Sequence, residues 1–191
     1  MKKYTRLALV LCLAVCLLCG CGQTREPAPT ETEYVLPEVP QSQEILTPNL
    51  SGWKEYKLES GLCFSGPQGL GDAEVEGMAA YLRNAYFLVL AIEEPKTGTV
   101  LENITKQEYA AMLAENNGLD PFVTDCYGNL ATTNTALSYE GKTMFFYYVT
   151  VLETENSFFL IQIATPEELA QDNVLDMAAW SASFTWAPPQ T

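Results

Sequence analysis

Two cysteines at the end of an N-terminal apolar run offer the clearest chemistry in the chain. The sequence Leu18-Cys19-Gly20-Cys21 follows three positive charges and the apolar run 7–18. This order is typical of a lipobox, in which the last cysteine receives a diacylglycerol thioether and becomes the first residue of the mature protein. A lipobox needs a small residue before the modified cysteine, and Gly20 meets that need for Cys21. The sequence therefore predicts lipidation, including palmitate-type acyl chains, at Cys21.

The apolar run also indicates where the protein lives. As a helix it would extend ~18 Å, whereas the hydrocarbon core of a bilayer measures ~30 Å. An ordinary secretory signal cleaved near Gly20, or an uncleaved short anchor, is the alternative to lipidation. Two acyl chains give durable attachment, at ~0.8 kcal/mol per buried methylene. We expect a protein anchored by lipid to a bacterial cell membrane and facing away from the cytoplasm.

Two further cysteines, Cys63 and Cys126, remain in the mature chain. An exported domain permits a disulfide between them, and closing a loop of about 64 residues would contribute ~4 kcal/mol. The alternative is two small, buried, apolar side chains. A catalytic thiol is disfavoured, because the chain has no histidine to activate one.

The absence of histidine excludes several catalytic classes. Ser-His-Asp and Cys-His catalysis, HExxH zinc sites and two-histidine metal sites all require it, and the chain has none. A carboxylate pair remains possible, with the doublets Glu93-Glu94 and Glu167-Glu168 as candidates, but a strand end and a helix start explain both better. The oxygen-rich segment 115–120 suggests calcium, although helix termination at Gly118 explains it better. We expect no enzyme activity, cofactor or metal.

The charge of the chain excludes other partners. Removing residues 1–20 leaves seven Lys and Arg against 24 Asp and Glu, a net charge of −17. Nucleic acid is thereby excluded as a partner, because the phosphate backbone requires a basic surface. Lying flat on anionic lipid also requires Lys and Arg near the surface.

Composition divides the chain into four parts. Residues 1–20 form the lipoprotein signal peptide, and 21–50 form a lipidated, flexible tether rich in Pro and Glu. Its aliphatic islands at 34–36 and 45–46 are either incidental or segments that dock on the domain or on a partner. Residues 51–187 have the composition and size of one globular domain, and 188–191 form a short tail.

The domain is predicted to combine two helices with antiparallel strands. A capping box at Thr105 and Glu108 starts a helix that ends near Asn117, with Tyr109, Met112 and Leu113 on its buried face. A second helix is expected from a cap at Thr165 to about Trp180. Alternating apolar residues predict a meander of strands at 132–139, 143–153 and 157–164, with further strands at 86–93, 61–65 and 183–186. The middle strand is apolar on both faces, so helices should cover part of each face.

Tyrosines offer a possible binding face. Half of them should pack against the helices, while the others could line a cleft for sugar or peptide. The residues concerned are Tyr81, Tyr86, Tyr127, Tyr139, Tyr147 and Tyr148. By contrast, the run 158–161 is interpreted as a core strand.

The order of these elements resembles the PsbP-like family, which includes bacterial DcrB-like lipoproteins. The resemblance rests on a short strand ending in Phe64-Ser65-Gly66-Pro67, a long strand, the helix starting at Thr105-Lys106-Gln107-Glu108-Tyr109, the meander and a helix closing on Ser183-Phe184. It implies an α+β fold with an antiparallel sheet and helices packed on it, and an accessory or binding role without catalysis. It carries over no site residue.

Three functional hypotheses follow. The first is a lipid-anchored accessory or binding protein for an envelope protein or a small molecule. The second is a carboxylate-dependent glycan hydrolase, and the third is a structural subunit of an envelope complex. Two carboxylates ~5–10 Å apart in a concave site would favour the hydrolase.

Overall fold

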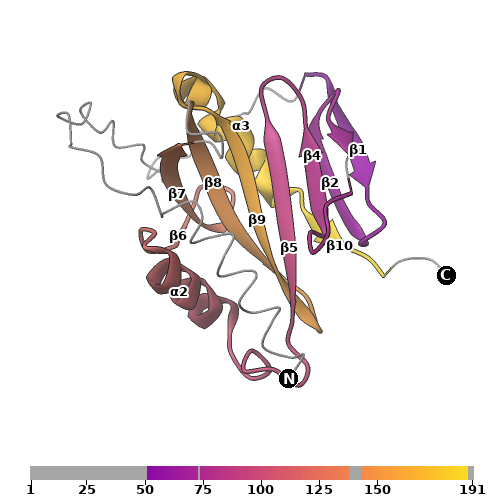
Figure 1. Ribbon diagram of the computed structural model, residues 1–191, viewed down its shortest axis with the longest axis vertical. Helices are drawn as coiled ribbons and strands as arrows, with labels where there is room; N and C mark the ends of the chain where they lie inside the picture. Colours follow the sequence, from indigo (N-terminus) through magenta and orange to yellow (C-terminus); the bar gives the residue numbers. More distant parts are fainter. Residues whose placement is uncertain (1–50, 73, 138–142, 189–191) are drawn as a thin grey trace.

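A computed structural model describes residues 51–72, 74–137 and 143–188 (Figure 1). Its main feature is a large antiparallel sheet with the strand order β3-β4-β5-β9-β8-β7-β6. These strands are β3 (Gly71–Asp72), β4 (Ala80–Arg83), β5 (Leu88–Pro95), β6 (Val123–Thr124), β7 (Leu130–Leu137), β8 (Met144–Glu153) and β9 (Ser157–Pro166).

A second, smaller sheet joins the two ends of the described chain. Strand β2 (Leu62–Pro67) pairs with both β1 (Trp53–Lys57) and β10 (Thr185–Trp186). A stack of rings fills its inner side, because Phe64 lies 4.9 Å from Tyr56 and 4.5 Å from Phe184 between ring centroids. The sequence indicated β2 and β10 but not β1, nor the separation of these strands from the large sheet.

Helix α2 (Lys106–Asn117) forms as its caps predict. Thr105 accepts the backbone N–H of Glu108, whose carboxylate in turn accepts the N–H of Thr105 at 2.7 Å. Gly118 ends the helix in the left-handed conformation with φ 62°. The prediction for Met112 is wrong, because this side chain is 38% exposed, whereas Ala110 and Ala114 lie buried beside Tyr109 and Leu113.

Helix α3 (Ala170–Ala182) begins differently from the prediction. Strand β9 continues to Pro166, and a short 3-10 helix η1 (Glu167–Leu169) follows it. Thr165 is therefore a fully buried strand residue paired with Phe146, and not a helix cap. The pairing register of β9 with β8 overrides the local capping signal.

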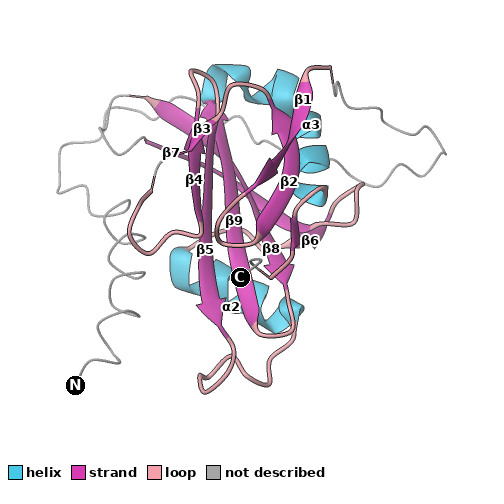
Figure 2. Cartoon of the chain, turned by 90° about the vertical axis from the view of Figure 1, so that its right-hand side faces the viewer, coloured by secondary structure: helices cyan, strands magenta, loops and turns pink. Residues whose placement is uncertain are grey.

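The large sheet is covered on both faces, as the sequence of β8 predicts. Phe146 and Tyr148 of β8 point into a core shared with α3 and the small sheet. Val149 and Val151 point to the opposite face, where they pack with Tyr109 and other residues of α2. Figure 2 shows the layers in side view, with α3 near β1 and β2 and with α2 toward the lower end of the large sheet.

The other predicted elements are found close to their expected positions. The meander is β7, β8 and β9, the strand expected at 86–93 is β5, and the run 158–161 is core strand in β9. Strands β3 and β4 occupy part of 71–83, a segment that the sequence did not assign. Within the described residues, no helix has both the length and the apolar character needed to cross a membrane. The signal peptide, the tether and Cys21 lie outside the described residues.

Candidate binding site

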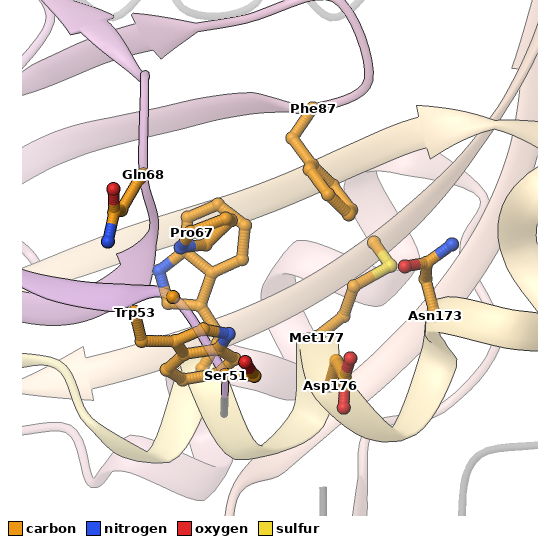
Figure 3. Close-up of a pocket in the computed structure, with 10 residues that line it drawn as sticks. Ser51, Trp53, Pro67, Gln68, Phe87, Asn173, Asp176 and Met177 are labelled. Carbon is orange, nitrogen blue, oxygen red and sulfur yellow. The ribbon is translucent and has the colours of Figure 1, made fainter. Parts of the chain in front are cut away.

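A pocket with aromatic walls lies between the small sheet, α3 and the residues that precede β5 (Figure 3). Its volume is about 190 Å³. Trp53 and Pro67 lie on one side and Phe87, Met177 and Asn173 on the other. The full lining is Ser51, Gly52, Trp53, Pro67, Gln68, Phe87, Asn173, Asp176, Met177 and Trp180.

One face of α3 supplies the floor of the pocket. Asn173, Asp176, Met177 and Trp180 recur at three- and four-residue spacing, which places them on the same side of a helix. Met177 is fully buried and Trp180 is 1% exposed, so these two side chains are fixed by the core. Asn173 donates to the carbonyl of Leu169 at 2.7 Å, which holds its amide against the first turn of α3.

The small sheet supplies one wall, and a glycine allows it to come close. Trp53 opens β1 opposite Pro67 of β2, and its ring centroid lies 6.3 Å from that of Trp180. Gly66 faces the indole of Trp180 so closely that a Cβ there would be 2.8 Å from the Nε1 atom. The buried Nε1–H of Trp180 has no hydrogen-bond partner among the residues that the structure describes. The close packing of β2 on α3 is therefore maintained, although the buried Trp180 N–H makes no hydrogen bond within the described residues.

A turn between β4 and β5 positions the third aromatic wall. The side-chain oxygen of Asn84 accepts the backbone N–H groups of Tyr86 and Phe87, both at 2.8 Å. The N–H of Asn84 also donates to the carbonyl of Phe87 at 2.9 Å. An Asn side chain that closes a turn in this way fixes the residues after it. The Phe87 ring therefore reaches Trp180 at 5.7 Å, inclined by 82°.

The edge of the pocket is polar and carries one acidic group. Gln68 is exposed, and Asn173 and Asp176 are half-buried. Asp176 is the only charged residue among the ten that line the pocket, all of which belong to the described part of the chain. Half-buried aromatic walls with a few convergent polar groups are the usual composition of a ligand site.

The volume limits what can enter. Sites for drug-sized ligands measure roughly 300–1,000 Å³, whereas this pocket offers about 190 Å³. It therefore accommodates one side chain or one ring and not an extended ligand.

The predicted sites are not in this pocket. Cys63 of β2 and Cys126, in the turn before β7, are both free thiols. Burial and the neighbouring Asp125 carboxylate raise the pKa of the Cys126 thiol. A raised thiol pKa suppresses the thiolate that nucleophilic chemistry needs.

The acidic doublets and the oxygen-rich segment also have structural roles. Glu93 accepts a hydrogen bond from the Ser157 hydroxyl at 2.6 Å. Burial raises the pKa of Glu94, and the nearby Tyr109 hydroxyl partly offsets this rise. Glu167 and Glu168 form part of η1. In the oxygen-rich segment, the side chain of Asn117 donates to the carbonyl of Leu113 at 2.8 Å, which is part of helix termination.

The tyrosines considered as a binding face differ in exposure. Tyr148 is fully buried while Tyr86 is 61% exposed, and Tyr139 lies outside the described residues. Tyr127 lines a second cavity of about 230 Å³ together with Lys106 and Ser181, and the residues described as lining this cavity differ from those that line the aromatic pocket.

A buried polar network lies beside that second cavity and was not anticipated from the sequence. The Tyr148 hydroxyl donates to the Asp125 carboxylate, and Asn129 donates to the same carboxylate at 2.8 Å. Asn129 also donates to the carbonyl of Ala178 at 2.9 Å, which ties the turn before β7 to α3. The signal available in the sequence was the turn-forming segment 125–129, whose side chains commonly bond to nearby backbone.

Comparison with known proteins gives fold likenesses only. No protein-family model and no curated protein matches the chain. Among solved structures, the chain is similar to cyanobacterial PsbP from Synechocystis sp. PCC 6803, with 11% identity, a TM-score of 0.44, and coverage of 71% of this chain and 93% of that one.

Two further structures are similar to a comparable degree. The Ran-binding protein Mog1p of Saccharomyces cerevisiae is 12% identical, with a TM-score of 0.42 over 70% of this chain and 95% of that one. A protein from Bacteroides thetaiotaomicron is 14% identical, with a TM-score of 0.48 over 71% of this chain and 49% of that one. The chain thus spans about half the length of the Bacteroides protein. The α+β class with an antiparallel sheet is shown, and the similar structures include a PsbP protein, but they carry no conclusion about function.

Proposed function

We propose that this chain is a binding protein without catalytic activity, anchored by lipid on Cys21 outside the cytoplasm, and that it holds a partner through the aromatic pocket. The observation that carries the proposal is the pocket itself. Trp53 and Phe87 are half-buried around a fully buried floor of Met177 and Trp180. Large aromatic residues in such positions supply much of the affinity of protein interfaces.

The chemistry of the pocket supports binding over catalysis. Glycan cleavage by carboxylates needs an acid and a second carboxylate in the same cleft, yet Asp176 is the one carboxylate among the described residues of the pocket lining. The described residues that line the second cavity include no carboxylate. The chain also contains no histidine, the most common general acid and base.

The anchor and the charge support the proposed location. The lipobox at 18–21 predicts the anchor, and the tether 21–50 would reach ~30 Å on average if flexible. A pocket on a domain held at that distance is accessible to proteins of the same membrane. The strong negative charge of the domain favours a protein partner over nucleic acid.

Chemical crosslinking in membranes of cells that make the protein tests the proposal. We expect one crosslinked complex with the natural sequence and a loss on the order of ten-fold with Trp53→Ala, because truncating a central aromatic anchor costs about 2 kcal/mol or more. Trp186→Phe is the matched control. This tryptophan lies outside the pocket and donates from Nε1 to the carbonyl of Ser60 at 3.1 Å, so its loss perturbs the fold but not the site. An unchanged yield with Trp53→Ala would contradict the proposal.

A further inference from the structure

The rings of the aromatic pocket are arranged as a corner and not as a flat platform. Trp180 meets Phe87 at 82° and Trp53 at 62°, and this edge-to-face packing on a buried ring holds the half-buried Trp53 and Phe87 on opposite sides of the pocket (Figure 3). Aromatic rings that surround a pocket can enclose a cation, as in aromatic cages. The electron-rich ring faces attract the positive charge, and tryptophan is the most effective of the aromatic side chains.

The charge around the pocket has the sign that a cation needs. Among the described residues that line the pocket, Asp176 alone is charged. Its negative charge also acts on Tyr127, whose pKa is raised by burial and by the neighbouring groups Cys126, Asp176 and Asp125. The amide oxygens of Gln68 and Asn173 add acceptors at the edge of the pocket. The Asp176 carboxylate and these amide oxygens therefore favour a ligand group that is positively charged and donates hydrogen bonds.

The same chain already contains ammonium groups over aromatic rings. The Nζ atom of Lys54 lies 4.4 Å from the centroid of the Tyr56 ring. The Nζ atom of Lys96 lies 4.3 Å from the centroid of the Phe158 ring. Both distances fall within the ~6 Å over which such contacts are favourable.

We propose that the occupant of the aromatic pocket is a basic side chain, lysine or arginine, of the partner protein, with its cation among Trp53, Phe87 and Asp176. This inference rests on the proposed function and specifies the partner's chemistry. A pocket of about 190 Å³ has room for one such side chain and not for a larger ligand. The mature chain, with seven basic and 24 acidic residues, also attracts a basic partner at long range.

The experiment uses the full chain in a non-ionic detergent and follows the indole N–H signals of its tryptophans by NMR. The probes are N-acetyl-arginine amide and N-acetyl-lysine amide, with the neutral analogues N-acetyl-citrulline amide and N-acetyl-norleucine amide. We expect the charged probes to shift Trp53 and Trp180 at concentrations about ten-fold lower than the neutral ones. The Trp186 signal should stay in place, since this residue does not line the pocket.

Two variants locate the effect. Asp176→Asn should remove most of the preference for the charged probe, while Trp53→Ala should weaken both charged and neutral probes. Rising salt should weaken only the charged probes, because it screens Asp176. Equal affinity of arginine and citrulline probes, or a preference that survives Asp176→Asn, would overturn the inference.

Other outcomes distinguish a basic side chain from other cations. They also distinguish failure of this inference from failure of the proposed binding function. If phosphatidylcholine vesicles or tetramethylammonium bind more tightly than either amino acid probe, the pocket binds a quaternary ammonium ligand. That result would overturn the proposal of a basic side chain from a partner protein. If Trp53→Ala abolishes crosslinking in membranes but charged and neutral probes bind alike, the proposed function holds and this inference fails. If Trp53→Ala leaves crosslinking unchanged, the proposed function itself fails.

Discussion

At the scale of single residues, the floor of the pocket depends on a missing side chain. A Cβ at Gly66 would come within 2.8 Å of the Trp180 indole, whose ring is held by the core and cannot move aside. We expect Gly66→Ala to lower the free energy of unfolding by about 1–3 kcal/mol, the usual cost of overpacking. Gly71→Ala is the control, because its Cβ would lie 3.7 Å from the nearest atom and its backbone is not left-handed. Chemical denaturation of both variants measures the difference, and equal stabilities would contradict it.

The buried carboxylate of Asp125 gives a second prediction at this scale. Burial and the Asp125 carboxylate hold the pKa of Tyr148 well above its ordinary value, so the hydroxyl stays protonated and donates to that carboxylate. Tyr148→Phe removes the donor and should cost about 1–3 kcal/mol of unfolding free energy. Tyr147→Phe makes the same chemical change on the opposite face of β8, where the side chain is half-buried, and should cost less than about 0.5 kcal/mol. Thermal melts of the pair decide it, and a similar loss in both would refute the role of the network.

At the scale of elements, the packing of α2 on the sheet carries a pH dependence. Tyr109 of α2 stacks on Phe158 with ring centroids 4.4 Å apart, and Phe158 pairs with Glu94 of β5. Burial raises the pKa of Glu94 above its ordinary value of 4.5, so the folded state binds more protons than the unfolded chain. The contribution of Glu94 to stability therefore falls as the pH rises from 4.5 through the raised pKa.

Replacing Glu94 tests this sign. Glu94→Gln should be more stable than the natural sequence at neutral pH, and the difference should shrink as the pH falls below 4.5. The exposed Glu115 of α2 provides Glu115→Gln as the control, with a small effect at every pH. Urea denaturation at several pH values provides the measurement. A Glu94→Gln variant that loses stability at neutral pH would show that the charge is favourable where it lies.

Local signals predicted most elements, whereas contacts between distant segments decided the rest. The capping box of α2 and the two-faced pattern of β8 involve neighbouring residues, and both appear as expected. The cap expected at Thr165 fails because β9 continues its ladder with β8 as far as Pro166. Strand β1 was not predicted, because its buried and exposed residues do not alternate regularly. It is defined instead by its pairing with β2.

The aromatic pocket was beyond local reasoning for the same reason. Trp53, Phe87 and Trp180 are far apart in the sequence and come from β1, the turn before β5, and α3. The sequence predicted a helix in this region, but the signals of a helix do not indicate which strand packs against it. Tyrosines are more numerous than tryptophans in the sequence, but in the fold they range from fully buried to largely exposed.

For the whole molecule, the proposed location depends on one side chain, Cys21. If Cys21 carries the lipid, Cys21→Ser should move the protein from the membrane fraction to the soluble fraction or leave an unprocessed precursor. Metabolic labelling with a palmitate analogue should mark the natural sequence and not this variant. Cys19→Ser is the matched control and should retain both label and membrane attachment. Labelling of Cys21→Ser would assign the lipid to another residue.

The aromatic pocket is the surface that we propose holds a partner. A photo-crosslinking amino acid at the exposed Gln68, on the edge of the pocket, tests this role in intact cells. The same group at Glu115, on the exposed side of α2, is the control. We predict one defined crosslinked complex from position 68, its loss when Trp53→Ala is added, and no such complex from position 115. Equal crosslinking from both positions, or a complex at position 68 that is indifferent to Trp53→Ala, would contradict the claim.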